Sequence, residues 1–179
     1  GTGTISITSA LSNMGNLSFT GNEINWSASI DGTGTLTLKP TTTSNAINVA
    51  GSSDAGSTTL DITATELGLL GTGFSSIKIG GTTQSGGISI LADASFANSV
   101  TLQTSGSTYL AGNLTATGSA SITITGALSS GTLAGTTGVT INAVANGTGI
   151  GFTQGANTIT AAIGGVTITT NSQAGAGYS

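Results

Sequence analysis

Carboxylates are the only side chains of this sequence with obvious chemistry for catalysis. Six of the 179 residues are Asp or Glu, two are Lys, and His and Cys are absent. Paired carboxylates can cleave a glycosidic bond as acid and base. Asp31, Asp54 and Asp61 are spaced so that they could fall on adjacent turns of a β-helix. Turns and caps are the more common place for such carboxylates, so the sequence predicts no catalytic residue and a protein that is not an enzyme.

The missing residue types exclude several other kinds of site. Without His, Cys and Arg there is no Ser–His or Cys–His nucleophile pair, no usual zinc ligand set and no bidentate anion clamp. Neither an EF-hand loop nor a GGxGxDx nonapeptide array is present to bind calcium. A net charge of -4 with two lysines argues against neutralisation of phosphates. We therefore expect no metal, no cofactor and no nucleic-acid partner.

Two features of the sequence could bind a ligand. A flat array of Thr-x-Thr motifs can order water, as in some ice-binding solenoids, but the spacing of the motifs here is irregular. Trp26, Tyr109 and Tyr178 could stack on sugars, although core or turn packing is the more common role of such residues. The motifs are Thr35/Thr37, Thr115/Thr117, Thr123/Thr125, Thr158/Thr160 and Thr167/Thr169.

The composition favours short strands joined by tight turns. Charged residues make up 4% of the chain, against about 25% in an average globular domain, and 30 residues are Gly. Low charge with a mean hydropathy of +0.31 argues against disorder. Cysteine is absent, so no disulfide framework exists. The length suits a single domain, 1–179, and no apolar run approaches the roughly 20 residues of a membrane helix.

Pairs of apolar residues at i and i+2 recur along the whole chain. This period puts both side chains on one face of a strand, and most pairs are bounded by Gly, Asn, Ser or Asp, which favour turns. The predicted strands are about three to five residues long. The pairs are Ile5/Ile7, Leu17/Phe19, Ile24/Trp26, Leu36/Leu38, Ile47/Val49, Leu60/Ile62, Ile77/Ile79, Ile88/Ile90, Val100/Leu102, Ile122/Ile124, Val139/Ile141, Ile150/Phe152 and Val166/Ile168.

The spacing of these pairs predicts an all-β fold, a right-handed parallel β-solenoid. A β-sandwich with turns every 8–12 residues would also fit part of the pattern. Very short strands, glycine punctuation, loosely recurring units and scarce charge favour the solenoid, because like charges would otherwise stack about 4.8 Å apart. With roughly 20–25 residues per turn, the chain would make about eight turns, a rod of about 40 Å.

One segment breaks the pattern of strands. Thr63 followed by Glu66 is the capping-box pattern, in which the Thr hydroxyl and the Glu carboxylate satisfy each other's backbone N–H groups. Leu67 and the leucines that follow supply an apolar side, and Gly71 or Gly73 a stop. We therefore predict a helix of one to two turns over Thr63–Leu70, between turns of the solenoid.

Charge is confined to residues 1–93 of the sequence. No residue of 94–179 is charged, whereas a free soluble domain normally keeps an interspersed charged surface. Such a run predicts a surface covered by neighbouring copies, by glycan or by more of the chain. No charged or proline-rich cap is visible at either terminus, so an open sheet edge at each end would favour further strand pairing.

About a third of the chain resembles a known family. Gly32–Pro40, Leu60–Gly81 and Gly86–Ile90 are similar to a recurrent segment of filamentous-haemagglutinin-like, β-strand-repeat bacterial exoproteins. The most specific piece is Glu66–Gly80, which reads ELGLLGTGFSSIKIG. The resemblance implies a right-handed parallel β-helix that is exported and displayed at the cell surface as an adhesin or fibre. Family examples usually carry more charge, and the shared motif is structural, so no catalytic residue is implied.

Together these features predict a structural protein. We expect a subunit, or a portion of a longer exoprotein, of an extracellular filament at the bacterial cell surface that self-associates end to end or laterally into homo-oligomers, without membrane insertion. The alternative is an adhesin passenger module that binds glycans or other cells. An ice-binding solenoid and a polysaccharide-active β-helix are weaker alternatives.

Overall fold

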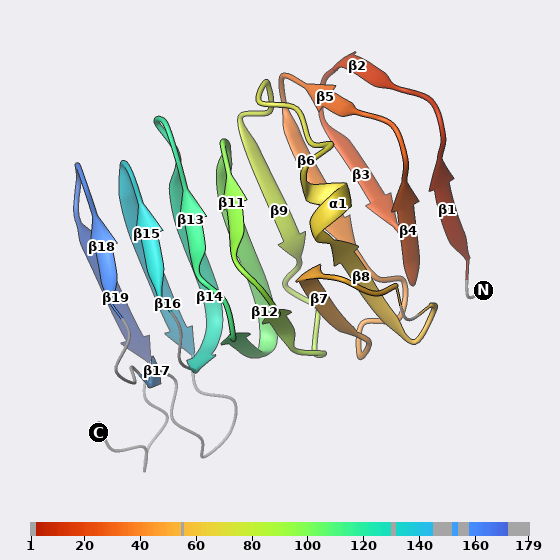
Figure 1. Cartoon of the computed structure of the whole chain (residues 1–179). Coiled ribbons are helices and arrows are strands. Elements are labelled where there is room, and N and C mark those ends of the chain that lie inside the picture. The colour runs from red at the N-terminus through yellow and green to blue at the C-terminus, as the bar shows by residue number, and fades with distance from the viewer. Residues whose placement is uncertain (1–2, 55, 130–131, 145–151, 154–157, 172–179) are drawn as a thin grey trace.

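The protein is built almost entirely from short β-strands that stack side by side, with one short helix against them (Figure 1). The computed structural model describes residues 3–54, 56–129, 132–144, 152–153 and 158–171. The strands are β1 (Thr4–Ile7), β2 (Leu11–Met14), β3 (Leu17–Thr20), β4 (Glu23–Trp26), β5 (Ile30–Gly32), β6 (Thr35–Lys39), β7 (Ala46–Gly51), β8 (Thr59–Thr63), β9 (Ser76–Gly80), β10 (Ile88–Ile90), β11 (Ala94–Phe96), β12 (Ser99–Leu110), β13 (Leu114–Ala116), β14 (Ser121–Ser129), β15 (Leu133–Gly135), β16 (Gly138–Val144), β17 (Phe152–Thr153), β18 (Ile159–Ala161) and β19 (Val166–Asn171), and the helix is α1 (Ala64–Leu67).

Every strand pair among the described residues is parallel, and the strands lie in three rows, which we call ladders, that the chain visits in the same order except at β8. The first ladder contains β1 and β4, then β8, β7, β10, the ends of β12 and β14, and β17. The second contains β2 and β5, then β11, β13, β15 and β18. The third contains β3, β6, β9, β12, β14, β16 and β19. Two adjacent parallel strands need a long connection, and here strands of the other two ladders supply it.

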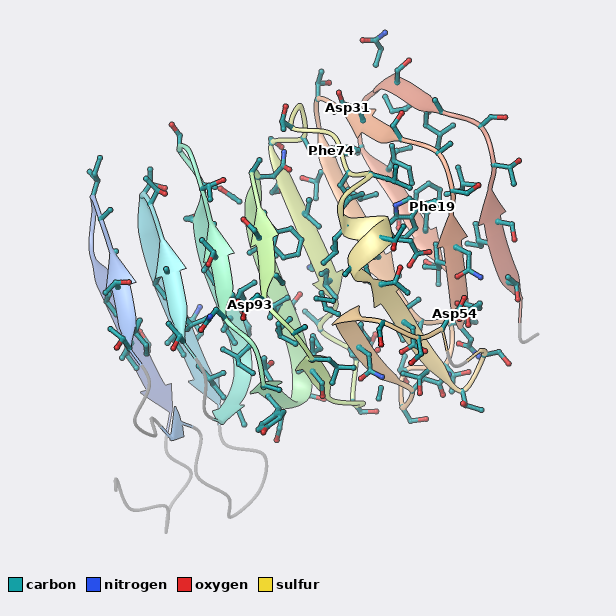
Figure 2. All side chains as sticks on the ribbon, viewed as in Figure 1. Phe19, Asp31, Asp54, Phe74 and Asp93 are labelled. Atoms are coloured by element: carbon teal, nitrogen blue, oxygen red, sulfur yellow. The ribbon has the colours of Figure 1, made fainter. Side chains whose placement is uncertain are left out.

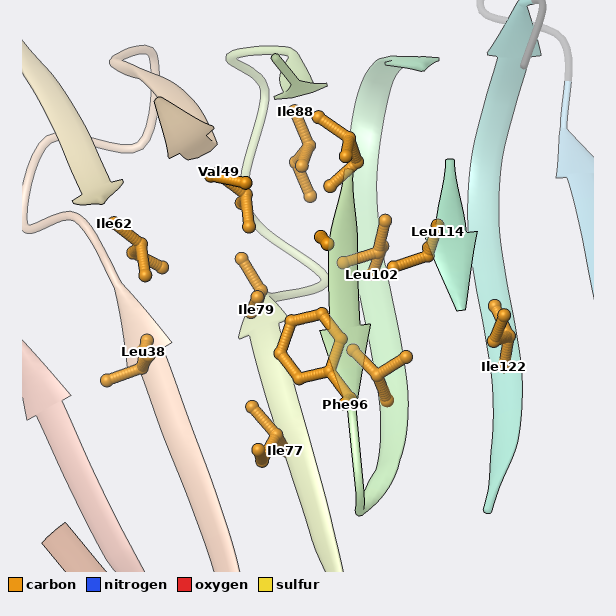
Figure 3. Close-up of a cluster of buried hydrophobic side chains, with 14 of the residues drawn as sticks. Leu38, Val49, Ile62, Ile77, Ile79, Ile88, Phe96, Leu102, Leu114 and Ile122 are labelled. Atoms are coloured by element: carbon orange, nitrogen blue, oxygen red, sulfur yellow. The ribbon is translucent and has the colours of Figure 1, made fainter. Parts of the chain in front are cut away.

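The third ladder is continuous through the described chain and organises the core. Its strands keep one register, so inward aliphatic side chains stack in two columns while the residues between them point outward. Side chains from all three ladders meet in this core (Figure 3). The columns are Leu17, Leu36, Ile77, Val100, Ile122, Val139 and Val166, and Phe19, Leu38, Ile79, Leu102, Ile124, Ile141 and Ile168.

The first ladder contains one strand out of sequence order. β8 follows β7 in the chain but lies on the N-terminal side of it, next to β4, while β10 pairs with the opposite edge of β7. The connection 52–58 returns from the end of β7 to the start of β8 (Figure 1). β4 contacts β8, but the two strands form no ladder. We call this contact between β4 and β8 the joint. Because no backbone pairing crosses the joint, it separates β1 and β4 from the rest of the first ladder.

The predicted helix exists and is shorter than expected. Its N-cap is Thr63, and both bonds of the capping box are formed: Glu66 N donates to Thr63 Oγ1 at 3.2 Å, and Thr63 N donates to Glu66 Oε2 at 2.8 Å. Gly68 ends the helix after one turn. Leu70 then forms an isolated parallel bridge with Ile30, so the chain rejoins the second ladder at once.

Every predicted strand pair whose two residues are described lies in a strand, whereas Ile150 falls outside the described residues. The second-ladder strands were not predicted, because most of them offer one large aliphatic residue with Ala or Gly in place of a pair, as in Leu133–Gly135. β12 and β14 are longer than the expected three to five residues, because each continues from the third ladder into the first. A register shift between Gln103 and Ser107 marks the bend in β12.

Candidate functional site

The three acids that the sequence analysis grouped do not form one site. Asp31 lies well apart from Asp54, and Asp93 is separate from both (Figure 2). The Asp31 carboxylate accepts hydrogen bonds from Gly32 N at 2.9 Å and Gly73 N at 3.0 Å. Asp31 therefore caps a turn and ties β5 to the segment before β9. The grouping with Asp54 and Asp61 was wrong because the chain between β5 and β8 does not advance by one regular turn.

Asp54 and Asp61 instead gather with two glutamates at the joint between β4 and β8. We call Glu23, Asp54, Asp61 and Glu66 the acidic cluster; they come from β4, the connection 52–58, β8 and α1. The charges of the other three all act on Glu23. The out-of-order placement of β8 explains the gathering, because it brings β8 and the connection before it next to β4.

Glu66 holds the joint together. Its Oε1 accepts a hydrogen bond from Trp26 N at 3.1 Å, and its backbone carbonyl accepts one from Trp26 Nε1 at 2.8 Å. Its Oε2 accepts from both the backbone N and the hydroxyl of Thr63 at 2.8 Å. One buried carboxylate thus bonds to β4 and to the end of β8, where the ladder between the two strands is missing. Charge-assisted bonds of this kind are stronger than neutral ones.

Glu23 has the opposite surroundings. Only 4% of it is exposed, and neither carboxylate oxygen has a hydrogen-bond partner. Burial, the largest cause, and the charges of the neighbouring carboxylates, Asp54 first among them, together raise the pKa of Glu23 from 4.5 to about 7. The charges of Asp61 and Glu66 act in the same direction. Glu23 therefore changes its charge near neutral pH inside a group of carboxylates.

A pocket of about 360 Å³ lies beside the acidic cluster, between β1, β4 and the start of α1. Asp54 and Glu66 reach its wall, together with Ser6 and Asn25, but Glu23 is not among the residues that line it. A protonated and an ionised carboxylate side by side are the pattern of an acid–base pair. Glu23 does not line the pocket, however, so a ligand there would not contact the carboxyl group whose pKa is raised.

Asp61 is the other buried acid of β8. It accepts a hydrogen bond at 3.0 Å from Asn48 Nδ2, which lies opposite it on β7. No group of three or more acidic side chains in the described ranges has a geometry that could hold a metal ion.

The outward side of the third ladder forms a second candidate surface, which we call the threonine face. It consists of one column from β12, β14, β16 and β19 and a parallel column two residues further along the same strands. All these side chains are exposed or half-buried, and the described register is constant. The columns are Thr101, Thr123, Thr140 and Thr167, and Gln103, Thr125, Asn142 and Thr169.

The aromatic residues considered for sugar stacking lie in different surroundings. Trp26 is 4% exposed and belongs to the joint, so its ring offers no surface to a glycan. Tyr109 is 48% exposed and lies next to Ser89 on the outside of the first ladder. Tyr178 lies outside the described residues.

Comparison with known protein families, with curated proteins and with solved structures finds no match to this chain. In the described parts of the structure, no helix has both the length and the apolar character needed to cross a membrane.

Proposed function

We propose that the chain is a right-handed parallel β-solenoid that serves as a structural segment or subunit of an extracellular bacterial fibre, extended by end-to-end stacking. Parallel crossovers are right-handed in about 98% of cases. The seven strands of the third ladder correspond to seven turns over the described residues. The single observation that supports stacking is the exposed apolar edge of β19.

β19 lies at one end of the third ladder in the described part of the chain, where its inward side chains continue the core columns and no further described strand pairs with its outer edge. Val166 and Ile168 are each 42% exposed, and Ile163 nearby is 69% exposed. At the other end, Leu17 and Phe19 of β3 are only partly buried. Neither β3 nor β19 contains a charged residue. Since all the strands are parallel, the edge of β19 matches the edge of β3 in a second copy.

The test compares two lysine substitutions on β19. Ile168→Lys places a charge in the column that stacking would bury, and burying an unpaired charge costs several kcal/mol, so association should weaken by roughly 100-fold or more. Thr167→Lys adds the same charge to the same strand on its outward side and should associate as the wild type does. Sedimentation over a concentration series, with electron microscopy of the particles, provides the measurement.

Two results would count against end-to-end stacking. One is a wild-type chain that stays a monodisperse short particle at every concentration. The other is an Ile168→Lys variant that assembles as the wild type does. A circular dichroism spectrum for each variant separates lost association from lost folding.

The threonine face supports a second candidate, the binding of ordered water or ice. The sequence spacing of the Thr-x-Thr motifs is irregular, but the connections absorb that irregularity and leave Thr123, Thr140 and Thr167 in one column. Hydroxyl groups repeat about every 4.8 Å between strands in the first column, and in the second column, about 6.7 Å further along each strand, amide and hydroxyl groups alternate. No residue from β12 to β19 is charged. A regular, flat and uncharged lattice is what a water-ordering surface requires.

Ice-recrystallisation inhibition tests this second candidate. Thr140→Lys should abolish any inhibition that the wild type shows, because the long charged side chain stands above the middle of the lattice. Thr115→Lys, on β13 of the second ladder, is the control and should leave inhibition unchanged. A wild-type chain without inhibition would retire the candidate and leave the stacking proposal untouched.

A further inference from the structure

The joint between β4 and β8 is the least bonded place in the first ladder. The two strands contact each other without a ladder. The side chain and carbonyl of Glu66 supply the bonds to Trp26 described above. On the other two ladders, the first two turns meet the rest through the Ile30–Leu70 bridge and through pairing of β6 with β9. Few other contacts therefore oppose the opening of the joint when a charge changes there.

Glu23 lies at this joint and faces only acids. Asp54 faces it from the connection 52–58, Asp61 from β8 and Glu66 from α1, while β1 and β7 contain no titratable residue. The two lysines, Lys39 and Lys78, belong to β6 and β9 of the third ladder. Among the described residues, no lysine is thus placed on the elements around Glu23 to balance its charge.

We propose that the joint is a proton-controlled contact: it is closed when Glu23 is protonated, and it loosens when Glu23 ionises beside the other three acids. The supporting geometry is a carboxyl group that is 4% exposed, has no hydrogen-bond partner and is surrounded by like charges. A buried charge without a partner is unfavourable, and like charges nearby add to the penalty. Separation of β4 from β8 and α1 lowers both energetic costs, because it admits water to Glu23 and moves the like charges apart.

The pH range of this change is set by the environment of Glu23. Its pKa of about 7 places ionisation between mildly acidic and mildly basic solution, whereas an ordinary Glu would be ionised throughout that range. Glu66 keeps its two bonds from Thr63 in either state and β6 stays paired with β9, whereas the bonds from Trp26 to Glu66 weaken as β4 moves away. The first two turns therefore become looser without separating from the third ladder. This inference does not depend on the stacking or ice-binding proposals.

Trp26 is the only tryptophan of the chain and donates from its indole to Glu66, so it reports on the joint directly. The experiment follows Trp26 emission of the full chain from pH 5 to pH 9, with EDTA present to remove divalent cations. We expect a shift to longer wavelength with a midpoint near the Glu23 pKa of about 7. Glu23→Gln keeps the shape of the side chain but cannot ionise, so its emission should stay constant across the range.

Two further variants make the test specific. Asp54→Asn removes the nearest charge acting on Glu23 and should move the midpoint to lower pH. Asp31→Asn removes a carboxylate that caps Gly32 and Gly73 away from the joint, so it should leave the midpoint unchanged. Because Asp54→Asn leaves Glu23 in place, it tests the proposal even where Glu23→Gln fails to fold.

Hydrogen exchange separates opening of the joint from simple quenching of the indole. After correction for the intrinsic effect of pH, exchange in β4 should rise several-fold between pH 6 and pH 8, while exchange in the paired β12 and β14 stays constant. The proposal is overturned by flat wild-type emission and exchange, by a Glu23→Gln variant with the wild-type midpoint, or by an Asp54→Asn variant with an unchanged midpoint.

Discussion

At the scale of single residues, two buried threonines of β12 differ in the surroundings of their hydroxyl groups. The Thr104 hydroxyl donates toward Gln84 O at 3.0 Å or Gly86 O at 2.8 Å and accepts from Gly106 N at 2.8 Å. The Thr108 hydroxyl is completely buried without a partner, in a position between Ile88 and Leu128. We therefore expect the threonine hydroxyl to stabilise the fold at position 104 and to destabilise it at position 108.

Replacement of each threonine by valine measures this difference. Thr108→Val removes an unsatisfied hydroxyl from an apolar column and should raise the free energy of unfolding by about 1 kcal/mol. Thr104→Val leaves Gly106 N without its acceptor and removes the hydroxyl donor to Gln84 O or Gly86 O, so it should lower the free energy of unfolding by about 2 kcal/mol. Urea denaturation of both variants beside the wild type is the measurement. Equal effects of the two substitutions would contradict the assigned surroundings.

Glu23 also predicts how stability depends on pH. Its pKa is about 7 in the fold against an ordinary 4.5, so between these values the folded chain holds a proton that the unfolded chain has lost. The stabilisation is complete below about pH 4.5, is lost as the pH rises toward 7, and amounts to at most about 3 kcal/mol. The difference in unfolding free energy between the wild type and Glu23→Gln should therefore change over this interval and stay constant above it. A constant difference from pH 4 to pH 8 would contradict the raised pKa.

At the scale of elements, the bend of β14 from the third ladder into the first depends on glycine. Gly126 has a φ of 124°, and a Cβ added there would overlap the Thr104 carbonyl oxygen. Gly126→Ala should therefore lower the free energy of unfolding by about 2–4 kcal/mol. Gly81 has no atom within 4 Å of the corresponding position, so Gly81→Ala should change stability by less than about 1 kcal/mol. Thermal unfolding of the pair, under one set of conditions, tests the bend.

The strands of the first and third ladders could be predicted because each offers two large aliphatic side chains to the core. Those of the second ladder could not, since β13 and β15 offer Leu with Ala or Gly. A recurrence was nevertheless present, because Ala94, Leu114 and Leu133 each begin a three-residue strand about 20 positions after the last. The inverted order of β7 and β8 has no such signal, because alternation shows that a segment is a strand and does not show which neighbour it pairs with.

The candidate site could be predicted only in part, because the sequence pattern does not show which strands become neighbours. Asp54 and Asp61 were recognised, and the Thr63–Glu66 capping box correctly placed the start of α1. Glu23 was missed, because its importance comes from the return of the chain beside β4 after a long separation in sequence. The register of the threonine face was missed as well, because variable connections conceal a constant spacing in space.

At the scale of the whole molecule, the joint divides the first two turns from the rest. Glu66 closes the joint itself, and the Ile30–Leu70 bridge and the four-residue pairing of β6 with β9 connect the same strands to the rest, whereas β12, β14 and β16 are tied by longer ladders. In stacked architectures stability is a sum of units and their interfaces. Native-state hydrogen exchange should therefore give β1 and β4 an opening free energy roughly 2 kcal/mol or more below that of β14.

A matched pair of variants checks this division. Glu66→Gln weakens the bonds at the joint and should lower the opening free energy of β4 with little effect on β14. Asp93→Asn alters a bond to Asn113 N, beyond the joint, and should leave β4 unchanged. Identical opening free energies in β4 and β14 would show that the described turns unfold as one unit.

The placement of β8 also constrains the order in which the chain can fold. A chain that emerges from its N-terminus makes β7 before β8, yet β8 belongs between β4 and β7. The edge of β4 must therefore stay vacant until residue 59 has emerged, while β7 is already available to occupy it. A β7 captured there would leave β8 without a place and would set every later turn on the wrong neighbour. Faithful folding thus requires that the edge of β4 stay vacant until β8 has formed, and pairing of β7 with β4 would be a kinetic trap.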